Sequence, residues 1–315
     1  MNFVNQHIPA EKRLTNTKTL MPYILLLRPH HWIKNLFLFL PLFFSGDVFN
    51  IEKLSGTLIG FIAFGFIASS IYIINDYRDI ESDKLHPEKS KRPLASGAVS
   101  KNAGLIIFFL CLIAGISISW FFLVPKFLFV LMIYFVLNIG YSFGLKNISI
   151  LDIMILSLGF ILRVKAGAVI TEIPISQWLM IMIFLLAFFM SVAKRRDDVL
   201  LKVSTGNNMR KAVKGYNLEF MNVMLSMITA IIIVAYIMYT ISPEVMERWK
   251  TYRLYYTSLF VIAGLLRYLQ ITFVENNTGS PTKLLYKDKF LQATIVLWIV
   301  SFYIIIYMPD ITIFK

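Results

Sequence analysis

Cysteine is almost absent from this 315-residue chain: the single one, Cys111, lies inside an apolar run. One thiol excludes an intrachain disulfide framework and argues against a structural metal cluster. Linkers rich in glycine, serine or proline are missing as well, so the sequence predicts one membrane domain over residues 23–315. Residues 1–22 lack the apolar core and the cleavage site of a secretory signal, and we expect them to form a retained cytoplasmic tail.

Charge is also scarce. Only 16% of the residues are charged, whereas 57% are hydrophobic and 15% aromatic, with 27 phenylalanines. A soluble domain of this length carries more charge and fewer aromatic residues. Many uncharged runs approach the roughly 20 residues with which an α-helix crosses a bilayer. The sequence therefore predicts an all-α fold, a polytopic membrane helical bundle.

The hydrophobic runs indicate nine membrane-spanning helices. The predicted spans are Trp32–Phe44, Leu54–Ile74, Ala103–Val124, Phe127–Phe143, Ile148–Ile170, Trp178–Ala193 (continuing as helix to Val203), Phe220–Ile241, Tyr255–Phe273 and Phe290–Met308. The first of these is short and is interrupted by Pro41.

Acidic residues are few beside basic ones, 18 against 31, which gives a net charge of +13. The basic residues gather in alternate loops, as the positive-inside rule requires, and the longest such stretch runs from Arg78 to Lys101. This pattern predicts an integral membrane protein with a cytoplasmic N-terminus and an external C-terminus. The membrane we expect is a bacterial inner membrane. Nucleic acid is not expected as a partner, because a basic patch would need a soluble face on which to bind it.

A cluster of carboxylates follows the charge-free run Gly56–Ile74. Asp76, Asp79 and Asp83 have the i, i+3, i+7 spacing that places side chains on one face of a helix, with Asn75 one turn before Asp79. Such carboxylates repel one another unless a cation lies between them, and Mg²⁺ usually takes one or two carboxylates together with substrate phosphates. The pattern predicts a Mg²⁺–diphosphate site at the cytoplasmic membrane face. The alternative is a solvated helix end whose acids balance the neighbouring lysines and arginines.

Cations that suit phosphate oxygens lie near both ends of this region. Arg28 and Lys34 belong to the run RPHHWIKN at a membrane entrance, and Lys91 and Arg92 follow the carboxylates. Anchoring of the chain at the cytoplasmic interface, with Trp32 as an interfacial aromatic, is the simpler interpretation of the first run.

Two further cations, Arg163 and Lys165, interrupt the fifth predicted span. A charge in the hydrocarbon costs roughly 2.5–3.5 kcal/mol on insertion scales and by default indicates a functional site. We expect Arg163 to bind a phosphate or to pair with an aspartate of the cluster; snorkelling or an ion pair with Asp152 is the alternative. The run Lys194–Asp198, KRRDD, ends the sixth span with charges of both signs and is expected to frame one polar cavity with the end of the second span.

These residues resemble a known family. The run Asn75-Asp76-x-x-Asp79-x-x-x-Asp83, the loop KRPLASG over residues 91–97 and the pattern Tyr141-Ser142…Lys146 are similar, in that order, to the UbiA superfamily of intramembrane prenyltransferases. The resemblance implies a helical bundle around a central cavity that opens to lipid, with Mg²⁺ and a diphosphate at its cytoplasmic end.

One departure separates the chain from the aromatic-acceptor members, which carry a second motif of the form Asp-x-x-Asp-Asp. Lys194 stands where the first of those carboxylates would be, which favours an additional phosphate group over a second metal. The decaprenyl-phosphate phosphoribosyltransferase branch is the part of the superfamily that the chain resembles most. The matching runs are Arg28–Asn35, Asp83-x-x-His86-Pro87, Gly159-Phe160-x-x-Arg163-x-x-x-Gly167, Ser176-Gln177-Trp178, Ala193-Lys194-Arg195 and Gly279-x-Pro281…Asp288.

The resemblance implies transfer of 5-phosphoribose from 5-phosphoribosyl 1-diphosphate to a polyprenyl phosphate, in cell-wall biosynthesis. It implies a catalytic set of Asp76, Asp79, Asp83 and Lys194, with the three aspartates as Mg²⁺ ligands. The implied substrate-binding residues are Arg28, Lys34, Asn75, Lys91, Arg92, Tyr141, Lys146, Arg163, Arg195 and Asp198. No general base is expected, because a phosphate nucleophile is already ionised near neutral pH.

Two other functions remain open on the sequence alone. One is an aromatic prenyltransferase of the same superfamily that uses a prenyl diphosphate. The other is a transporter or channel for an anionic solute, which the charges inside the fifth span would suit. The sequence also leaves open whether the chain forms a homo-oligomer and how long the lipid is.

Overall fold

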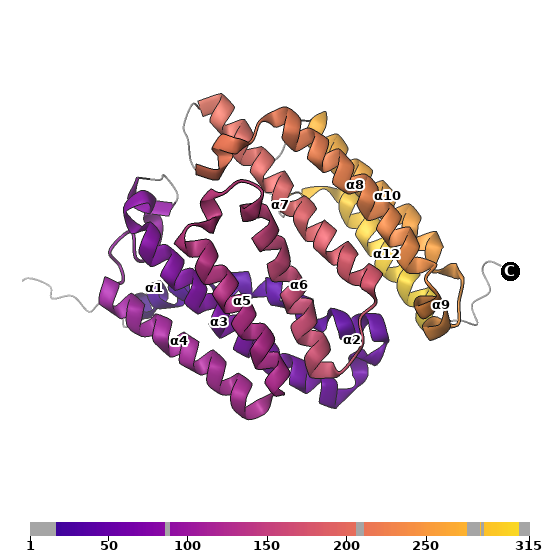
Figure 1. The fold of residues 1–315 in the computed structure, drawn as a ribbon, viewed down its shortest axis with the longest axis horizontal. Coiled ribbons are helices and arrows are strands. Elements are labelled where there is room, and N and C mark those ends of the chain that lie inside the picture. Colours follow the sequence, from indigo (N-terminus) through magenta and orange to yellow (C-terminus); the bar gives the residue numbers. More distant parts are fainter. Residues whose placement is uncertain (1–16, 86–88, 206–210, 276–283, 285–286, 309–315) are drawn as a thin grey trace, which may run out of the picture. The chain divides into compact units, whose positions relative to one another are not determined.

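The computed structural model describes residues 17–85, 89–205, 211–275, 284 and 287–308, and these residues form helices and connections without a β-strand (Figure 1). The all-α prediction is therefore confirmed. The α-helices are α1 (Thr17–Leu27), α2 (Leu40–Ser45), α3 (Ile51–Lys84), α4 (Lys101–Phe122), α5 (Pro125–Phe143), α6 (Leu151–Thr171), α7 (Gln177–Thr205), α8 (Leu218–Thr240), α9 (Pro243–Trp249), α10 (Ser258–Phe273) and α12 (Lys289–Tyr307). The 3-10 helices are η1 (Pro29–Phe39), η2 (Asp47–Phe49), η3 (Lys89–Lys91), η4 (Leu145–Asn147), η5 (Lys211–Gly215) and η6 (Arg253–Thr257).

Within the described residues, eight helical segments are long and apolar enough to cross a membrane. They lie in α3, α4, α5, α6, α7, α8, the η6–α10 segment and α12, and they coincide with the second to the ninth predicted spans. The chain is thus an integral membrane protein with several spans. The predicted number of nine was approximate.

The first predicted span, Trp32–Phe44, is not one continuous α-helix. The chain there is divided into η1 and α2, and α1 lies upstream of them. Arg28, between α1 and η1, has a φ of 53°, and it precedes Pro29, which disfavours the right-handed helical conformation in the residue before it. Pro41 occupies the first turn of α2, where proline is readily accepted. The two prolines therefore replace a single span with short helical pieces.

The chain folds into two compact units. The first unit comprises residues 1–33 and 62–117, and the second comprises residues 34–61 and 118–315. The single membrane domain over residues 23–315 stays a prediction, as does the tail over residues 1–22, of which Thr17 and the residues after it begin α1.

In the first unit, hydrogen bonds fasten the start of η1 to α3. The Trp32 indole Nε1 donates to Ser69 Oγ at 3.0 Å, and Ser69 Oγ donates to the carbonyl oxygen of Leu27 at 2.7 Å. Leu27 and Trp32 lie on either side of Arg28 in the sequence. The two bonds consequently hold the segment that carries Arg28 against the face of α3.

In the second unit, the middle of α6 lies directly on the backbone of η1. A Cβ atom at Gly167 would come within 2.0 Å of the carbonyl oxygen of Leu38, so only glycine allows this approach. The remainder of the second unit is held by a core between α6, α7, α8 and α10. Its buried members include Ile153, Phe189, Val192, Met221, Leu225, Ile228 and Ile271.

Replacing Gly167 should therefore destabilise the protein. We expect Gly167→Ala to lower the free energy of unfolding by about 1–3 kcal/mol, because overpacking forces the backbone of η1 or α6 to move. Thermal unfolding in detergent can be followed with a thiol-reactive dye, since Cys111 is buried and is the only cysteine. Gly140→Ala is the matched control, because its Cβ would meet only the flexible Leu145 side chain at 3.2 Å. Equal melting temperatures for the two variants would contradict the prediction.

Candidate active site

The last turns of α3 carry the three aspartates predicted from the sequence. Asp76 and Asp83 are seven residues apart and point to nearly the same side of the helix, where they are 2% and 3% exposed. Asp79 is half-buried, and its Oδ2 accepts a hydrogen bond from Asn75 Nδ2 at 3.2 Å. The structure thus separates the cluster into a buried pair and a third carboxylate that is bonded within its own helix.

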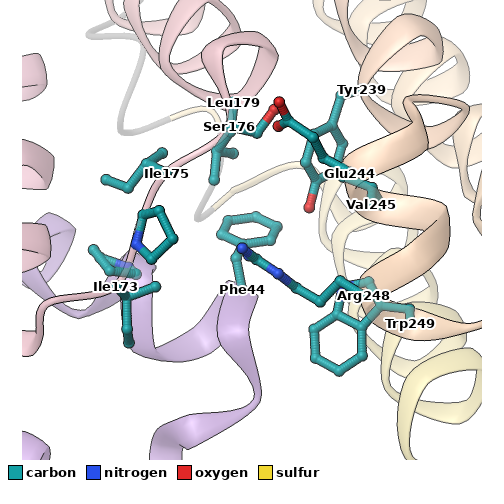
Figure 2. Close-up of a pocket in the computed structure, with 12 residues that line it drawn as sticks. Phe44, Ile173, Ile175, Ser176, Leu179, Tyr239, Glu244, Val245, Arg248 and Trp249 are labelled. Atoms are coloured by element: carbon teal, nitrogen blue, oxygen red, sulfur yellow. The ribbon is translucent and has the colours of Figure 1, made fainter.

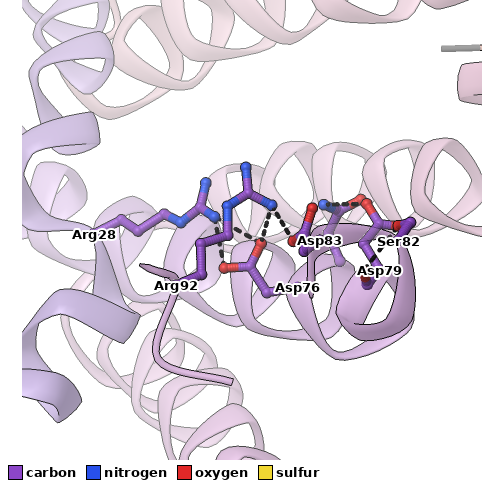
Figure 3. Close-up of polar contacts among 7 residues, drawn as sticks. Arg28, Asp76, Asp79, Ser82, Asp83 and Arg92 are labelled. Atoms are coloured by element: carbon purple, nitrogen blue, oxygen red, sulfur yellow. Dashed lines mark hydrogen bonds and ion pairs between the residues drawn. The ribbon is translucent and has the colours of Figure 1, made fainter. Parts of the chain in front are cut away.

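Two arginines bind the buried pair, and Figure 3 shows them reaching Asp76 and Asp83 from separate segments. Arg28 Nη2 donates to both carboxylate oxygens of Asp76 at 2.6 Å. Arg92 Nη1 donates to Asp76 Oδ1 at 3.1 Å and to Asp83 Oδ2 at 2.6 Å. Two positive and two negative side chains therefore neutralise one another, as groups largely withdrawn from water must.

Local backbone structure positions the guanidinium groups of Arg28 and Arg92 against the aspartates. Arg28 is held near α3 by the bonds of Trp32 and Leu27 described above. Arg92 follows η3 within a compact turn, in which its N–H donates to the Lys89 carbonyl at 3.0 Å and its own carbonyl accepts from Ser96 N–H at 2.8 Å. The predicted phosphate-binding loop is therefore a formed turn that packs one of its cations on the aspartates. Lys91, the other predicted cation of this loop, is exposed.

The donor chemistry of this cluster fits a divalent cation. Carboxylate oxygens are the ligands that Mg²⁺ prefers in proteins. Within the part of the chain that the structure describes, however, no three His, Cys, Asp or Glu side chains are arranged to hold a metal ion. Arg28 and Arg92 occupy oxygens of Asp76 and Asp83 that a metal would need. A metal bound there would therefore share these carboxylates with the arginines or displace them in part.

The second unit contains a buried ion pair between α6 and the C-terminal half of α7. Arg195 Nε donates to Asp152 Oδ2 from α6, and Arg195 Nη1 donates to Asp198 Oδ2 at 2.8 Å. Arg195 and Asp152 are 1% and 0% exposed, whereas the adjacent Lys194 is exposed. Among the cations predicted for this helix end, only Lys194 faces outward. An ion pair between Asp152 and Arg163 is one alternative from the sequence, but the structure pairs Asp152 with Arg195.

Arg163 is 4% exposed in α6 and binds protein groups on three sides. Its Nε donates to Asn35 Oδ1 at 2.9 Å, its Nη1 to the Gly159 carbonyl at 2.8 Å and its Nη2 to the Tyr134 hydroxyl at 2.8 Å. The guanidinium carbon also lies 4.7 Å from the centroid of the Tyr134 ring. These contacts tie η1, α5 and α6 together. No sequence pattern singles out Tyr134, and Asn35 stands out only as the last residue of the run RPHHWIKN.

The remaining predicted residues are distributed as follows. Tyr141 lies in the last turn of α5, Lys146 lies in η4 and Lys34 is an exposed residue of η1. All three belong to the second unit. Lys165 is exposed on α6. His86, Pro87 and the loop Gly279–Thr282, named in the sequence motifs, lie outside the described residues. The aspartates and their arginines belong to the first unit.

A small cavity in the second unit lies apart from all of the predicted site residues. Its volume is about 20 Å³, which is room for a single water molecule. Figure 2 shows Ile173 and Ile175 on one side of it and Arg248 and Trp249 on the other. Because it is so small and none of the predicted phosphate ligands lines it, it is no candidate for the substrate site.

Asp288, the last residue of the predicted Gly-x-Pro…Asp motif, has a structural role. Its Oδ1 accepts the Leu291 N–H at 2.8 Å and so caps the N-terminus of α12. Its Oδ2 accepts from Arg267 Nη2 at 2.8 Å. The bond from Arg267 and the backbone N–H groups hold the pKa of the Asp288 carboxyl below its usual value.

Comparison with known proteins supplies the relatives of this chain. The profile of the UbiA prenyltransferase family matches residues 36–272. The decaprenyl-phosphate phosphoribosyltransferase of Corynebacterium glutamicum is 32% identical over 291 residues, which cover 90% of this chain and 86% of that protein. The enzyme of the same name from Mycolicibacterium smegmatis is 31% identical, over 86% of this chain and 88% of its own length.

Solved structures share the fold. A UbiA homolog from Archaeoglobus fulgidus, bound to DMAPP and Mg²⁺, superposes with a TM-score of 0.67 and covers 91% of this chain and 99% of its own. Its sequence is 19% identical. At that identity the likeness establishes the helical architecture.

The Asp288–Arg267 pair makes stability depend on pH. A carboxyl whose pKa is lowered in the folded state stabilises that state above its unfolded pKa of about 3.9, and the contribution is lost as the pH falls through the folded value. We expect Asp288→Asn to lower the melting temperature at pH 7, and the difference from the parent protein to shrink toward pH 3. Asparagine keeps the N-cap, so the comparison isolates the charge. A difference that stays constant with pH would refute this account.

Proposed function

Because this chain belongs to the UbiA prenyltransferase family, we propose that it transfers 5-phosphoribose from 5-phosphoribosyl 1-diphosphate to a polyprenyl phosphate and releases diphosphate. The relatives that bear the name decaprenyl-phosphate phosphoribosyltransferase support this proposal. The observation that carries it within the chain is Lys194, an exposed cation where aromatic-acceptor members would have a carboxylate. We place the reaction at the cytoplasmic face of a bacterial inner membrane, the side on which the basic loops lie.

The chemistry is a displacement at C1 of the ribose. An oxygen of the polyprenyl phosphate attacks C1, the bond between C1 and the diphosphate oxygen breaks, and diphosphate leaves with the electron pair. The attacking phosphate is ionised, so no side chain has to remove a proton. The protein's part is to hold two anionic substrates together and to stabilise the charge on the leaving group, which is usually the largest contribution in such transfers.

The aspartates at the end of α3 are assigned to the leaving diphosphate and its metal. Asp76, Asp79 and Asp83 would hold Mg²⁺, and Asn75 would support Asp79 through their hydrogen bond. When bound there, Mg²⁺ would supply positive charge next to the diphosphate oxygens. Arg28 and Arg92 already lie on this cluster, and their guanidinium groups suit bidentate contact with phosphate as well as with carboxylate.

The other cations are assigned to the remaining phosphates. Lys34, Lys91 and Arg92 would bind the 5-phosphate or the diphosphate of the donor. Lys194, with Arg163 less directly, would bind the phosphate of the lipid. Tyr141, Lys146 and Asp198 complete the proposed substrate-binding set. Arg195, which the resemblance also implies as a substrate ligand, is 1% exposed and paired with Asp152, so we leave it out of this set.

A second candidate is prenyl transfer from a prenyl diphosphate to an aromatic acceptor. It is favoured by one observation: a structure of this fold from Archaeoglobus fulgidus was solved with DMAPP and Mg²⁺. Both reactions release diphosphate, so the aspartate cluster serves either one. They differ in the group that is transferred and therefore in the labelled product.

An assay with both donors distinguishes these functions. Purified protein in detergent receives Mg²⁺, polyprenyl phosphate and either 5-phosphoribosyl 1-diphosphate or a prenyl diphosphate with an aromatic acceptor. We expect a phosphoribosyl lipid from the first mixture only. Product from the second mixture alone would establish the alternative. Formation of either product in detergent, where no gradient exists, also separates an enzyme from a transporter.

Substitutions of a residue assigned to the diphosphate or of one assigned to the lipid phosphate should abolish turnover. We expect Asp79→Ala and Lys194→Ala each to reduce kcat/KM by at least about 100-fold, the scale of losing one electrostatic stabiliser in a transfer site. Neither residue is fully buried, so expression and the melting temperature should be unchanged. Lys165→Ala, at another exposed cation of the second unit, serves as the control and should retain activity. Full activity in the Asp79 or Lys194 variant would rule out the role assigned to that residue.

A further inference from the structure

The connection between η4 and α6 contains a strained residue. Ile150, immediately before α6, has a φ of 70° and a ψ of −50°. A β-branched residue in this region of backbone conformation is a genuine outlier. Such strain persists only where surrounding structure holds it, and it often accompanies a functional constraint.

A continuous set of hydrogen bonds holds Ile150 in place. Its N–H donates to the hydroxyl of Tyr216, and that hydroxyl donates to Asp152 Oδ1 at 2.8 Å. The other oxygen of Asp152 accepts from Arg195 Nε, and Arg195 Nη1 continues to Asp198 Oδ2 at 2.8 Å. The network therefore links the segment before α6, the segment before α8 and the end of α7, all within the second unit.

The interior of this network is closed to solvent. Asp152 is 0% exposed, Arg195 1% and Tyr216 5%. Burial raises the pKa of the Tyr216 phenol, so Tyr216 stays protonated and continues to donate to Asp152. Buried charge-assisted bonds of this kind are strong and directional, and breaking one side leaves an uncompensated charge. Asp152 thus holds Arg195 toward α6, and Asp198 holds it from within α7.

The ends of the network lie beside two cations that the proposed function uses. Lys146 precedes Ile150 by four residues in the short η4 segment, and Lys194 immediately precedes Arg195 on α7. The segment between η4 and α6 is in direct contact with η5, because a Cβ atom at Gly215 would lie 2.3 Å from Ser149 Oγ. Any loosening at Tyr216 would reach the Lys146 segment through Ile150 and the α7 end through Asp152.

We propose that Asp152, Arg195 and Tyr216 form a positioning network that fixes Lys146 and Lys194 for binding substrate phosphates, and that Arg195 itself does not contact substrate. This inference rests on the proposed function for the roles of the two lysines. It gives a positioning role to Asp152 and Tyr216, which the sequence did not single out as site residues. It also changes the role of Arg195 from substrate ligand to buried support.

The test compares two buried tyrosines that each lose one hydroxyl. Tyr216→Phe breaks the network, whereas Tyr236→Phe removes a hydroxyl that is bonded to Thr257 and Trp298 away from these segments. We expect amide hydrogen exchange over residues 144–150 to accelerate in Tyr216→Phe only. We also expect KM for the diphosphate donor to rise about tenfold in Tyr216→Phe, equivalent to ~1.4 kcal/mol of binding, with a smaller change in kcat.

The two readouts separate failure of this inference from failure of the proposed function. Unchanged exchange over residues 144–150 in Tyr216→Phe would overturn the network's positioning role whatever the substrate. Faster exchange with an unchanged KM would show that the network is structural only and would overturn the proposal as well. Should the parent protein use a prenyl diphosphate as its donor, the proposed function fails, and the same KM comparison is made with that donor.

The role of Arg195 is tested by removing one charge or both. Asp152→Asn should lower the melting temperature, because Arg195 then lacks a buried counter-ion, and the double variant Asp152→Asn/Arg195→Gln should recover most of the loss. If Arg195 only supports its neighbours, KM for the donor in the double variant will not exceed that in Asp152→Asn. A further rise of KM on adding Arg195→Gln would show direct contact with substrate and refute the proposal.

Discussion

Pairing of ionised groups at places where they are withdrawn from water is the constraint on which this structure depends. Arg28 and Arg92 neutralise Asp76 and Asp83, and Arg195 neutralises Asp152, in a chain that is otherwise apolar. An unpartnered charge in such surroundings would be too costly to retain. Each pair therefore also determines how its segments are rotated and how closely they approach. Fold and candidate chemistry are set by the same contacts.

The cluster of Arg28, Arg92 and the aspartates differs from the Arg195–Asp152 pair in its access to solvent, and we assign the two different roles on this basis. The side chains of Arg28 and Arg92 are 15% and 25% exposed, so an arriving phosphate could compete with the aspartates for these arginines. Arg195 is closed off, and a phosphate would have to open the protein to reach it. The partly exposed pairs of Arg28 and Arg92 therefore suit exchange of a carboxylate for a phosphate. The closed pair of Arg195 and Asp152 suits support of the neighbouring segments.

The sequence predicted the helical class and eight of the spans. These features depend on local apolar length, which composition and spacing reveal directly. The sequence assigned Arg92 to a substrate phosphate, and the pairing of the aspartates with neighbouring cations was only its alternative. The partner of Asp152 was beyond such reasoning, because Arg163 and Arg195 lie on different helices and only the packing of α6 against α7 decides between them. The division of the first predicted span between η1 and α2 depended on how Pro29 and Pro41 are accommodated. Tyr134 and Tyr216 were missed because a tyrosine among many aromatic residues carries no spacing signal.

The length of α3 has a consequence for how the two substrates meet. Its 34 residues make a rod of about 51 Å, whereas the hydrocarbon of a bilayer is only about 30 Å thick. The charge-free part, Gly56–Ile74, is enough to cross that hydrocarbon, so the turns that bear Asp76, Asp79 and Asp83 project into the headgroup layer. Under the proposed function, a water-soluble sugar diphosphate would bind there without losing its hydration to the hydrocarbon, and a lipid phosphate would reach the same depth by lateral diffusion. A dissolved reactant and a membrane-bound one would thus meet at the same depth.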